Sequence, residues 1–147
     1  MKPLSILAAT ATLLTTPVFA DGHATGDAAA GERTFRQCIS CHVVVDAEGE
    51  TLAGRNARTG PNLYGIHGRT IGSVEDFRYS AGLEALMDAE MTWDEESFVA
   101  YVQDPTGWIR EAAGDDSLRG AMSFRVRSEE DALNLYAYLV SLGSSEE

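Results

Sequence analysis

Apolar side chains recur at three- and four-residue spacing near the end of the chain, as on one face of a helix. Ser128-x-x-Asp131 is a start signal for this predicted helix, and Gly143 is a stop signal. The apolar positions are Ala132, Leu135, Tyr136, Leu139 and Leu142. The pattern therefore predicts a C-terminal helix with one buried face.

Two more helices are predicted by their boundary residues. Asp27 is a suitable N-cap for a first helix over residues 28–37. Thr92-x-x-Glu95 has the form of a capping box, which predicts a helix that runs to about residue 104 and that Pro105 ends. A shorter helix is expected over residues 81–89.

The segments between these helices are long. Residues 43–71 are rich in glycine and turn residues, and residues 106–121 read as an irregular loop. No alternating strand pattern is visible, so the fold class is predicted to be all-α, with three to five short helices and long loops. Such a chain buries little apolar area unless something else fills its centre.

The first 20 residues have the form of a signal peptide. Lys2 supplies a positive charge, residues 4–14 are apolar, and Val18-Phe19-Ala20 fits a cleavage site. We expect cleavage after Ala20, export to the periplasm and one mature domain over residues 21–147. The alternative is a retained membrane anchor, but the apolar stretch is shorter than the ~20 residues that span a bilayer.

The composition excludes nucleic acid as a partner. Lys2 is the only lysine, so removal of the signal peptide leaves ten arginines against 23 acidic residues, a formal net charge of −13. The arginines are unevenly placed. Residues 51–74 and 117–128 hold six of the ten and no acidic residue.

Both cysteines of the chain fall in the pentapeptide Cys38-Ile39-Ser40-Cys41-His42. Two thiols at this spacing can each form a thioether with one haem, and the adjacent histidine can then bind the iron. The alternatives are a thioredoxin-like dithiol, which needs a βαβ context, and a zinc site, which needs more ligands at matching spacing. Neither context is visible, so covalent haem attachment is the favoured interpretation.

A haem iron with one histidine is either open on its other side or closed by a second protein ligand. The candidates are His23, His67, Met87, Met91 and Met122. Both histidines read as solvated loop residues, and Met87 and Met91 as core packing beside a short helix. Met122 lies in an irregular loop before the last helix, where a flexible thioether can fold over the haem, so we expect it to be the ligand.

These features resemble the class I c-type cytochromes, and within them the larger bacterial cytochrome c2 type. Gly31-x-x-x-Phe35 before the pentapeptide is similar to the family's first helix, which crosses the last helix near Leu135 and Tyr138. The resemblance implies the class I cytochrome c fold, wrapped around one covalently bound haem c.

The resemblance also implies roles for single residues. Cys38 and Cys41 would hold the haem, with His42 and Met122 as axial ligands of the iron. The proline of Thr59-Gly60-Pro61-Asn62 matches the family's carbonyl partner of the histidine. Residues that match the rest of the haem surroundings are Arg69, Tyr79, Trp93 and Tyr101. The chain departs from the family in having Gly120-Ala121-Met122, where threonine and lysine often precede the methionine.

The resemblance implies a soluble periplasmic one-electron carrier, not an enzyme, without stable membrane insertion and monomeric. Its implied partners are a cytochrome bc complex as donor and a terminal oxidase or photosynthetic reaction centre as acceptor. The first alternative is a haem enzyme or gas-binding cytochrome with an open iron site. The second is a haem-free dithiol oxidoreductase.

By the family's layout, the two arginine-rich windows lie around the electron-exchange face. This leads to the hypothesis of a dipolar molecule, acidic overall but positive or neutral where it docks. The alternative is that these arginines are solvated and have no docking role.

Overall fold

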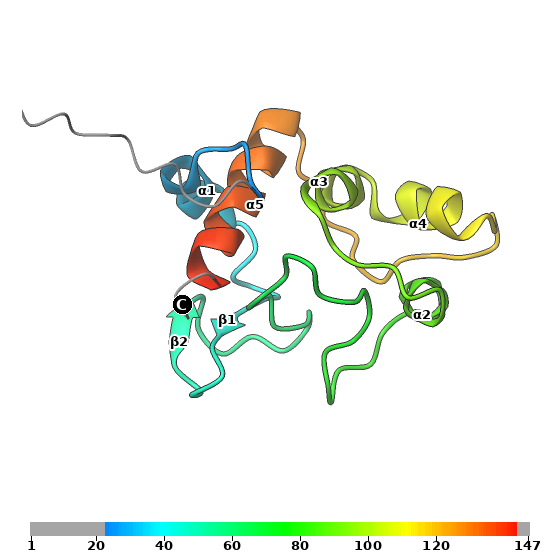
Figure 1. The fold of residues 1–147 in the computed structure, drawn as a ribbon, viewed down its shortest axis with the longest axis horizontal. Coiled ribbons are helices and arrows are strands. Elements are labelled where there is room, and N and C mark those ends of the chain that lie inside the picture. Colours follow the sequence, from blue (N-terminus) through cyan, green and yellow to red (C-terminus); the bar gives the residue numbers. More distant parts are fainter. Residues whose placement is uncertain (1–22, 144–147) are drawn as a thin grey trace, which may run out of the picture.

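A computed structural model describes residues 23–143, and within them five helices carry most of the regular structure. The predicted signal peptide and its cleavage point lie outside the described residues. In Figure 1, α1 and α5 cross on one side of the molecule, and α2, α3 and α4 lie on the other. The helices are α1 (Ala28–Phe35), α2 (Ala81–Asp88), α3 (Glu95–Gln103), α4 (Pro105–Ala113) and α5 (Glu129–Gly143).

The crossing of α1 and α5 depends on a glycine. A side chain at Gly31 would collide with the backbone carbonyl of Asn134 and would lie 2.7 Å from Cβ of Tyr138. The rings of Phe35 and Tyr138 pack beside this contact, with centroids 5.7 Å apart. The predicted close approach of the first and last helices is confirmed.

Both of these helices begin where their capping residues predict. The Asp27 side chain accepts hydrogen bonds from the backbone N–H groups of Ala29 and Ala30, and Ser128 Oγ accepts from Asp131 N at 3.0 Å. The end of α1 was predicted two residues too late. After Phe35 the chain tightens into turns that lead directly to Cys38, whose N–H donates to the Phe35 carbonyl at 2.8 Å.

The N-cap of α3 differs from the prediction. Asp94, not Thr92, is the capping residue, and its carboxylate accepts from Ser97 N at 2.8 Å while Ser97 Oγ accepts from Asp94 N. Thr92 instead pairs with Thr70 in an isolated antiparallel bridge. The Thr92–Glu95 prediction was wrong because Asp94 and Ser97 offer the same reciprocal geometry two residues later.

The segment predicted as one irregular loop after residue 105 contains a helix. Pro105 begins α4, since proline is well suited to the first helical turn, where its missing N–H costs nothing. Asp104 caps this helix by accepting from Gly107 N at 3.2 Å, and Gly114 ends it in the left-handed conformation (φ 66°). Pro105 therefore ends one helix and starts the next.

A short antiparallel hairpin was also missed. β1 (Val44–Val45) pairs with β2 (Thr51–Ala53), within a stretch predicted to be loop alone. Strands of two and three residues are too short to show an alternating pattern. The fold remains all-α in its framework.

The core lies between the two groups of helices. α5 contacts both α1 and α3, and α4 contacts both α2 and α3. Tyr136, Leu139 and Ile109 are completely buried among them. Among residues 23–143, no helix is both long and apolar enough to pass through a lipid bilayer.

Candidate functional site

The two thiols lie in the turn that follows α1. Backbone N–H groups of Cys41 and His42 both donate to the Cys38 carbonyl, at 3.0 and 2.9 Å, so the pentapeptide continues the helical direction. Both cysteines are half-buried, and they form no disulfide. The turn thus presents two free thiols and one imidazole from a single compact segment.

The electrostatics of Cys38 argue against a thioredoxin-like pair. Burial, with a smaller contribution from Cys41, raises the pKa of the Cys38 thiol to about 11. A dithiol oxidoreductase needs the opposite shift, because the thiolate is the nucleophile. The motif also follows a helix, not a strand, so the βαβ context is absent from this part of the chain.

The His42 ring is oriented by a carbonyl. Its Nδ1 lies 2.9 Å from the Pro61 oxygen, so a proton on Nδ1 is donated to this carbonyl and the Nε2 lone pair stays available. Burial lowers the pKa of His42, partly offset by this hydrogen bond. The neutral form, which can bind a metal, is therefore favoured. The predicted pairing of His42 with Pro61 is present.

Two residues that hold this loop had no role in the sequence-based prediction. Asn62 joins the loop to β1: its Oδ1 accepts from Val45 N at 3.0 Å, and its Nδ2 donates to the Val45 carbonyl at 2.7 Å. Gly60 lies against the imidazole, and a Cβ there would be 2.6 Å from His42 Nδ1. The turn signal Thr59-Gly60-Pro61-Asn62 contained both residues, but their contacts are made with residues distant in sequence.

Four of the other predicted residues are brought together by pairing of residues 68–71 with residues 91–93. Gly68 N donates to the Trp93 carbonyl at 2.8 Å, and Trp93 N donates to the Arg69 carbonyl at 3.0 Å. The Trp93 ring packs against Tyr101, with centroids 5.1 Å apart. Tyr79 interacts electrostatically with both Arg69 and Tyr101, so all four form one cluster.

Arg69 is half-buried and has no carboxylate partner among residues 23–143. Its guanidinium donates to the Tyr64 carbonyl at 2.6 Å, and burial lowers its pKa. Burial also raises the pKa of Tyr101 to about 12, which keeps this phenol protonated. The cluster thus offers a cation and neutral donors, a set suited to an anionic group.

The aromatic part of the cluster extends further than predicted. Trp108 on α4 stacks on Trp93, with centroids 5.5 Å apart and an interplanar angle of 23°. Trp108 was missed because α4 itself was missed.

The methionines differ in their surroundings. Met122 is half-buried, packs against the core, and lies in the segment without regular structure between α4 and α5. Met91 is also half-buried against the core, whereas Met87 is 37% exposed, which corrects its prediction as a core residue. Among residues 23–143, two thioethers are half-buried, and of these Met122 lies in the long segment before α5.

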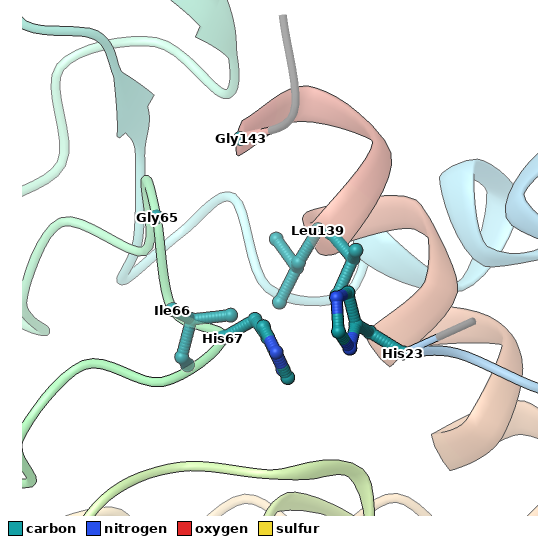
Figure 2. A pocket seen from close by; sticks show the side chains of 7 residues that line it. His23, Gly65, Ile66, His67, Leu139 and Gly143 are labelled. Carbon is teal, nitrogen blue, oxygen red and sulfur yellow. The ribbon is translucent and has the colours of Figure 1, made fainter. Parts of the chain in front are cut away.

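The two remaining histidines are not isolated loop residues. Their rings stack with centroids 4.2 Å apart, and His67 Nδ1 lies 2.7 Å from the Tyr136 hydroxyl. Figure 2 shows the pair at the edge of a small cavity that Ile66 and Leu139 line on its apolar side. Both histidines are exposed and lie in turns, as predicted, but their stacking was not foreseen because it joins residues 44 positions apart.

Comparisons with known proteins agree with this fold and site. No family model matches the chain. It is 60% identical to cytochrome c2 of Rhodovulum adriaticum over 122 residues, which cover 83% of this chain and 97% of that protein. It is 48% identical to cytochrome c2 of Cereibacter sphaeroides over 140 residues, 95% of this chain and 92% of that protein. The crystal structure of cytochrome c2 from Rhodobacter sphaeroides superposes with a TM-score of 0.79 at 49% identity, covering 81% and 98% of the two chains.

The fold is therefore that of the class I c-type cytochromes, electron-transport proteins with one covalently attached haem c. Within that class, the chain belongs to the cytochrome c2 family.

The residues present fit a haem. A tethered iron porphyrin with acidic side groups requires two thiols, a neutral imidazole and a cation. The chain offers the free thiols of Cys38 and Cys41, the His42 ring with one nitrogen engaged by Pro61, and the half-buried Arg69 guanidinium, which has no carboxylate partner in the described part of the chain. A glycine beside the imidazole leaves room for the ring in this orientation.

Proposed function

We propose that this protein is a soluble periplasmic one-electron carrier, and that Cys38 and Cys41 hold its haem through thioethers. The observation that carries the assignment is the 2.9 Å pairing of His42 with the Pro61 carbonyl, directly after two half-buried thiols. His42 and Met122 would be the two protein ligands of the haem iron. The haem supplies the chemistry, the reversible gain and loss of one electron.

The surrounding residues set the conditions for that chemistry. Pro61 fixes the orientation and raises the basicity of His42 by accepting its Nδ1 proton. Arg69, Tyr79 and Trp93 provide charge and hydrogen-bond donors for the acidic groups of the haem. Tyr101 is buried against Trp93 and excludes water from the same region.

A carrier is favoured over an enzyme because the chain itself would supply both protein ligands of the iron, His42 and Met122. His67 is engaged by Tyr136 and His23, and Met87 is exposed, which supports Met122 as the second ligand. A methionine ligand raises the reduction potential relative to two histidines. The alternative, an open iron site for gas binding or catalysis, would need Met122 to stay away from the iron.

The proposed donor is a cytochrome bc complex, and the proposed acceptor is a terminal oxidase or a photosynthetic reaction centre. Export, cleavage after Ala20 and a monomeric state belong to the same proposal. The kinship with cytochromes c2 supports it, and the two arginine-rich windows without acidic residues, 51–74 and 117–128, support docking to a partner.

The decisive experiment is an optical spectrum of the processed protein, ferric and ferrous, with and without carbon monoxide. We expect the native ferrous spectrum to resist carbon monoxide, and Met122→Ala to bind it readily. Met91→Ala is the matched control, since it removes the other half-buried thioether and should leave the spectrum unchanged. A native protein that binds carbon monoxide at once would favour the open-site alternative. A protein without covalent haem would refute the proposal as a whole.

A further inference from the structure

A buried tyrosine of α5 meets an exposed histidine away from the two cysteines and His42. The Tyr136 side chain is completely buried, and its hydroxyl lies 2.7 Å from Nδ1 of His67. His67 itself is exposed. The phenol is thus shut off from water, whereas the imidazole that it contacts is not.

Burial keeps the phenol in its protonated form. Together with smaller contributions from Asp94 and Glu95, burial raises the pKa of the Tyr136 hydroxyl to about 12. A protonated phenol can donate its hydrogen bond to Nδ1 of a neutral imidazole, whose own proton is then on Nε2. The geometry therefore places the phenolic proton 2.7 Å or less from a basic nitrogen.

The surroundings of His67 favour a positive charge on its ring. The Asp94 carboxylate at the N-cap of α3 attracts His67 electrostatically, which makes a small contribution to the lowered pKa of Asp94. The ring of His23 stacks on His67, with centroids 4.2 Å apart, at the edge of the cavity in Figure 2. Because His67 is exposed, a proton that it takes up can also exchange with water.

Aromatic rings connect Tyr136 to the cluster that contains Trp93 and Tyr101. The ring of Phe98 lies between them, with its centroid 5.2 Å from that of Tyr136 and 6.4 Å from that of Trp93. Electrons tunnel readily between rings this close, because the rate falls steeply with distance. An electron that is removed from the Trp93 cluster can therefore be replaced from Tyr136.

We propose that Tyr136 and His67 form a redox-active pair, in which Tyr136 gives one electron to a strong oxidant and its phenolic proton to His67. The O–H bond of Tyr136 breaks and an N–H bond forms at Nδ1 of His67, so the products are a neutral tyrosyl radical and an imidazolium ion. A peroxyl radical, as the oxidant, gains the electron together with a proton from water and becomes a hydroperoxide. One electron from a mild reductant such as ascorbate, with return of the proton from His67, restores the pair.

The proton acceptor is what distinguishes Tyr136 as an electron donor. A phenol that loses only an electron becomes a cation, and an uncompensated charge in a buried site is costly. Transfer of the proton to His67 removes this charge from the buried position. The pair goes beyond the proposed carrier function, because it uses side chains of the polypeptide and not the iron.

The alternative role of His67 is purely structural. A buried tyrosine hydroxyl usually has a hydrogen-bond partner, and His67 could serve only as that partner. The two roles differ in what they require of residue 67. A structural partner must accept a hydrogen bond, whereas a redox partner must accept the proton itself.

The test uses ferric, haem-loaded protein and one equivalent of tris(bipyridine)ruthenium(III), which takes up one electron. Electron paramagnetic resonance of rapidly frozen samples should show a tyrosyl radical, and stopped-flow absorbance should give its rate of formation. Tyr136→Phe should lose most of the radical signal. Tyr138→Phe is the matched control, since Tyr138 lies on the same helix but packs against Phe35, and it should keep the signal.

His67→Asn separates proton transfer from structural support. The asparagine amide oxygen can accept the hydrogen bond from Tyr136, but it is not basic enough to take the proton. We expect the radical to form at least about a hundredfold more slowly in this variant, since a positioned proton acceptor typically contributes that factor or more. In the native protein, formation of the radical should also be slower in deuterated water, because a proton moves with the electron.

Two results would overturn the proposal. A radical signal that persists unchanged in Tyr136→Phe would place the oxidised residue elsewhere. A native rate that is the same in deuterated water, or that His67→Asn retains, would leave His67 with the structural role alone. The isotope measurement needs no mutation, so it decides the matter even if a variant does not fold. Haem spectra of the same samples show separately whether the proposed carrier function fails.

Discussion

Two regions of this molecule, the crossing of α1 with α5 and the loop over residues 54–80, are held in place in different ways. At the crossing, α1 and α5 touch through backbone, and each helix starts at a residue that can be identified from sequence. In the other region, residues 54–80 run without a helix or strand. Asn62 ties this segment to the Val45 carbonyl, and Arg69 ties it internally by donating to the Tyr64 carbonyl. The helix crossing is specified by steric fit, whereas the loops are specified by individual polar contacts.

Positive and negative side chains are also distributed differently between the loops and the helices. The loop windows 51–74 and 117–128 contain arginines without acids, while the first turn of α5 is Glu129-Glu130-Asp131. Acidic residues at a helix N-terminus interact favourably with the helix dipole. These acidic residues therefore stabilise the start of α5, while the arginine windows contain no acidic residue.

The largest effect is expected where the helices cross. Gly31→Val would place a branched side chain against the Asn134 carbonyl and Tyr138, which we expect to destabilise the folded state by about 3 kcal/mol. Guanidinium unfolding of the haem-loaded protein measures this loss. Gly49→Ala is the control: its Cβ meets nothing within 4 Å, so only its backbone conformation (φ 85°) costs about 1 kcal/mol. Equal losses for the two variants would show that the crossing is not sterically controlled.

In the loop region, we expect removal of one polar side chain to destabilise the fold. Asn62→Ala removes bonds to both backbone groups of Val45 and to Tyr64 N (3.1 Å), which we expect to cost about 2 kcal/mol. Asn56→Ala, at an exposed position in the same region, should cost almost nothing. Urea unfolding of the two variants compares them. If Asn62→Ala is as stable as Asn56→Ala, these contacts do not fix the loop.

The charge difference can be tested by kinetics. Replacing Arg119 and Arg127 by glutamate should slow reduction by a cytochrome bc complex roughly tenfold at low salt, because steering by the exposed positive loop is lost. Stopped-flow rates across ionic strengths measure this. Arg33→Glu on α1 is exposed and should have little effect. If the rates did not depend on ionic strength, we would conclude that these arginines have no docking role.

The smallest effect concerns the start of α3. The hydrogen bonds from Ser97 lower the pKa of Asp94, so this carboxylate stabilises the fold above its unfolded pKa, and the gain is lost as pH falls through the lowered pKa. Asp94→Ala should cost about 1 kcal/mol at neutral pH. The difference from the native protein should shrink in acid, as urea unfolding at the two pH values can show. A difference that persists in acid would mean that the charge of Asp94 is unimportant.

Much of the helical framework could be predicted because its signals are local. The spacing of apolar residues in α5 and the N-cap at Asp27 follow from neighbouring residues. The helix crossing at Gly31 follows from the likeness to cytochromes c2. α4 was missed because Pro105 reads equally as an end and as a beginning. Asp104 allows both, since it ends α3 and caps α4.

The site was less accessible to local reasoning. The pentapeptide identified the thiols and His42, but Met122 was favoured over other methionines only by its loop setting and the family likeness. The contacts of Asn62, the stacking of Trp108 on Trp93 and the His23–His67 pair join distant residues. Patterns among neighbouring residues in the sequence do not indicate such contacts, so they are seen only in the structure.

The carboxylate of Asp104 makes two contacts at the same time. The same oxygen accepts from Gly107 N at the start of α4 and pairs with Arg125 at 2.8 Å on the exposed loop. An acidic partner that recruits Arg125 must compete with Asp104 for it. Recognition at this loop is thereby coupled to the integrity of a helix, and a poorly matched surface would gain little from that arginine.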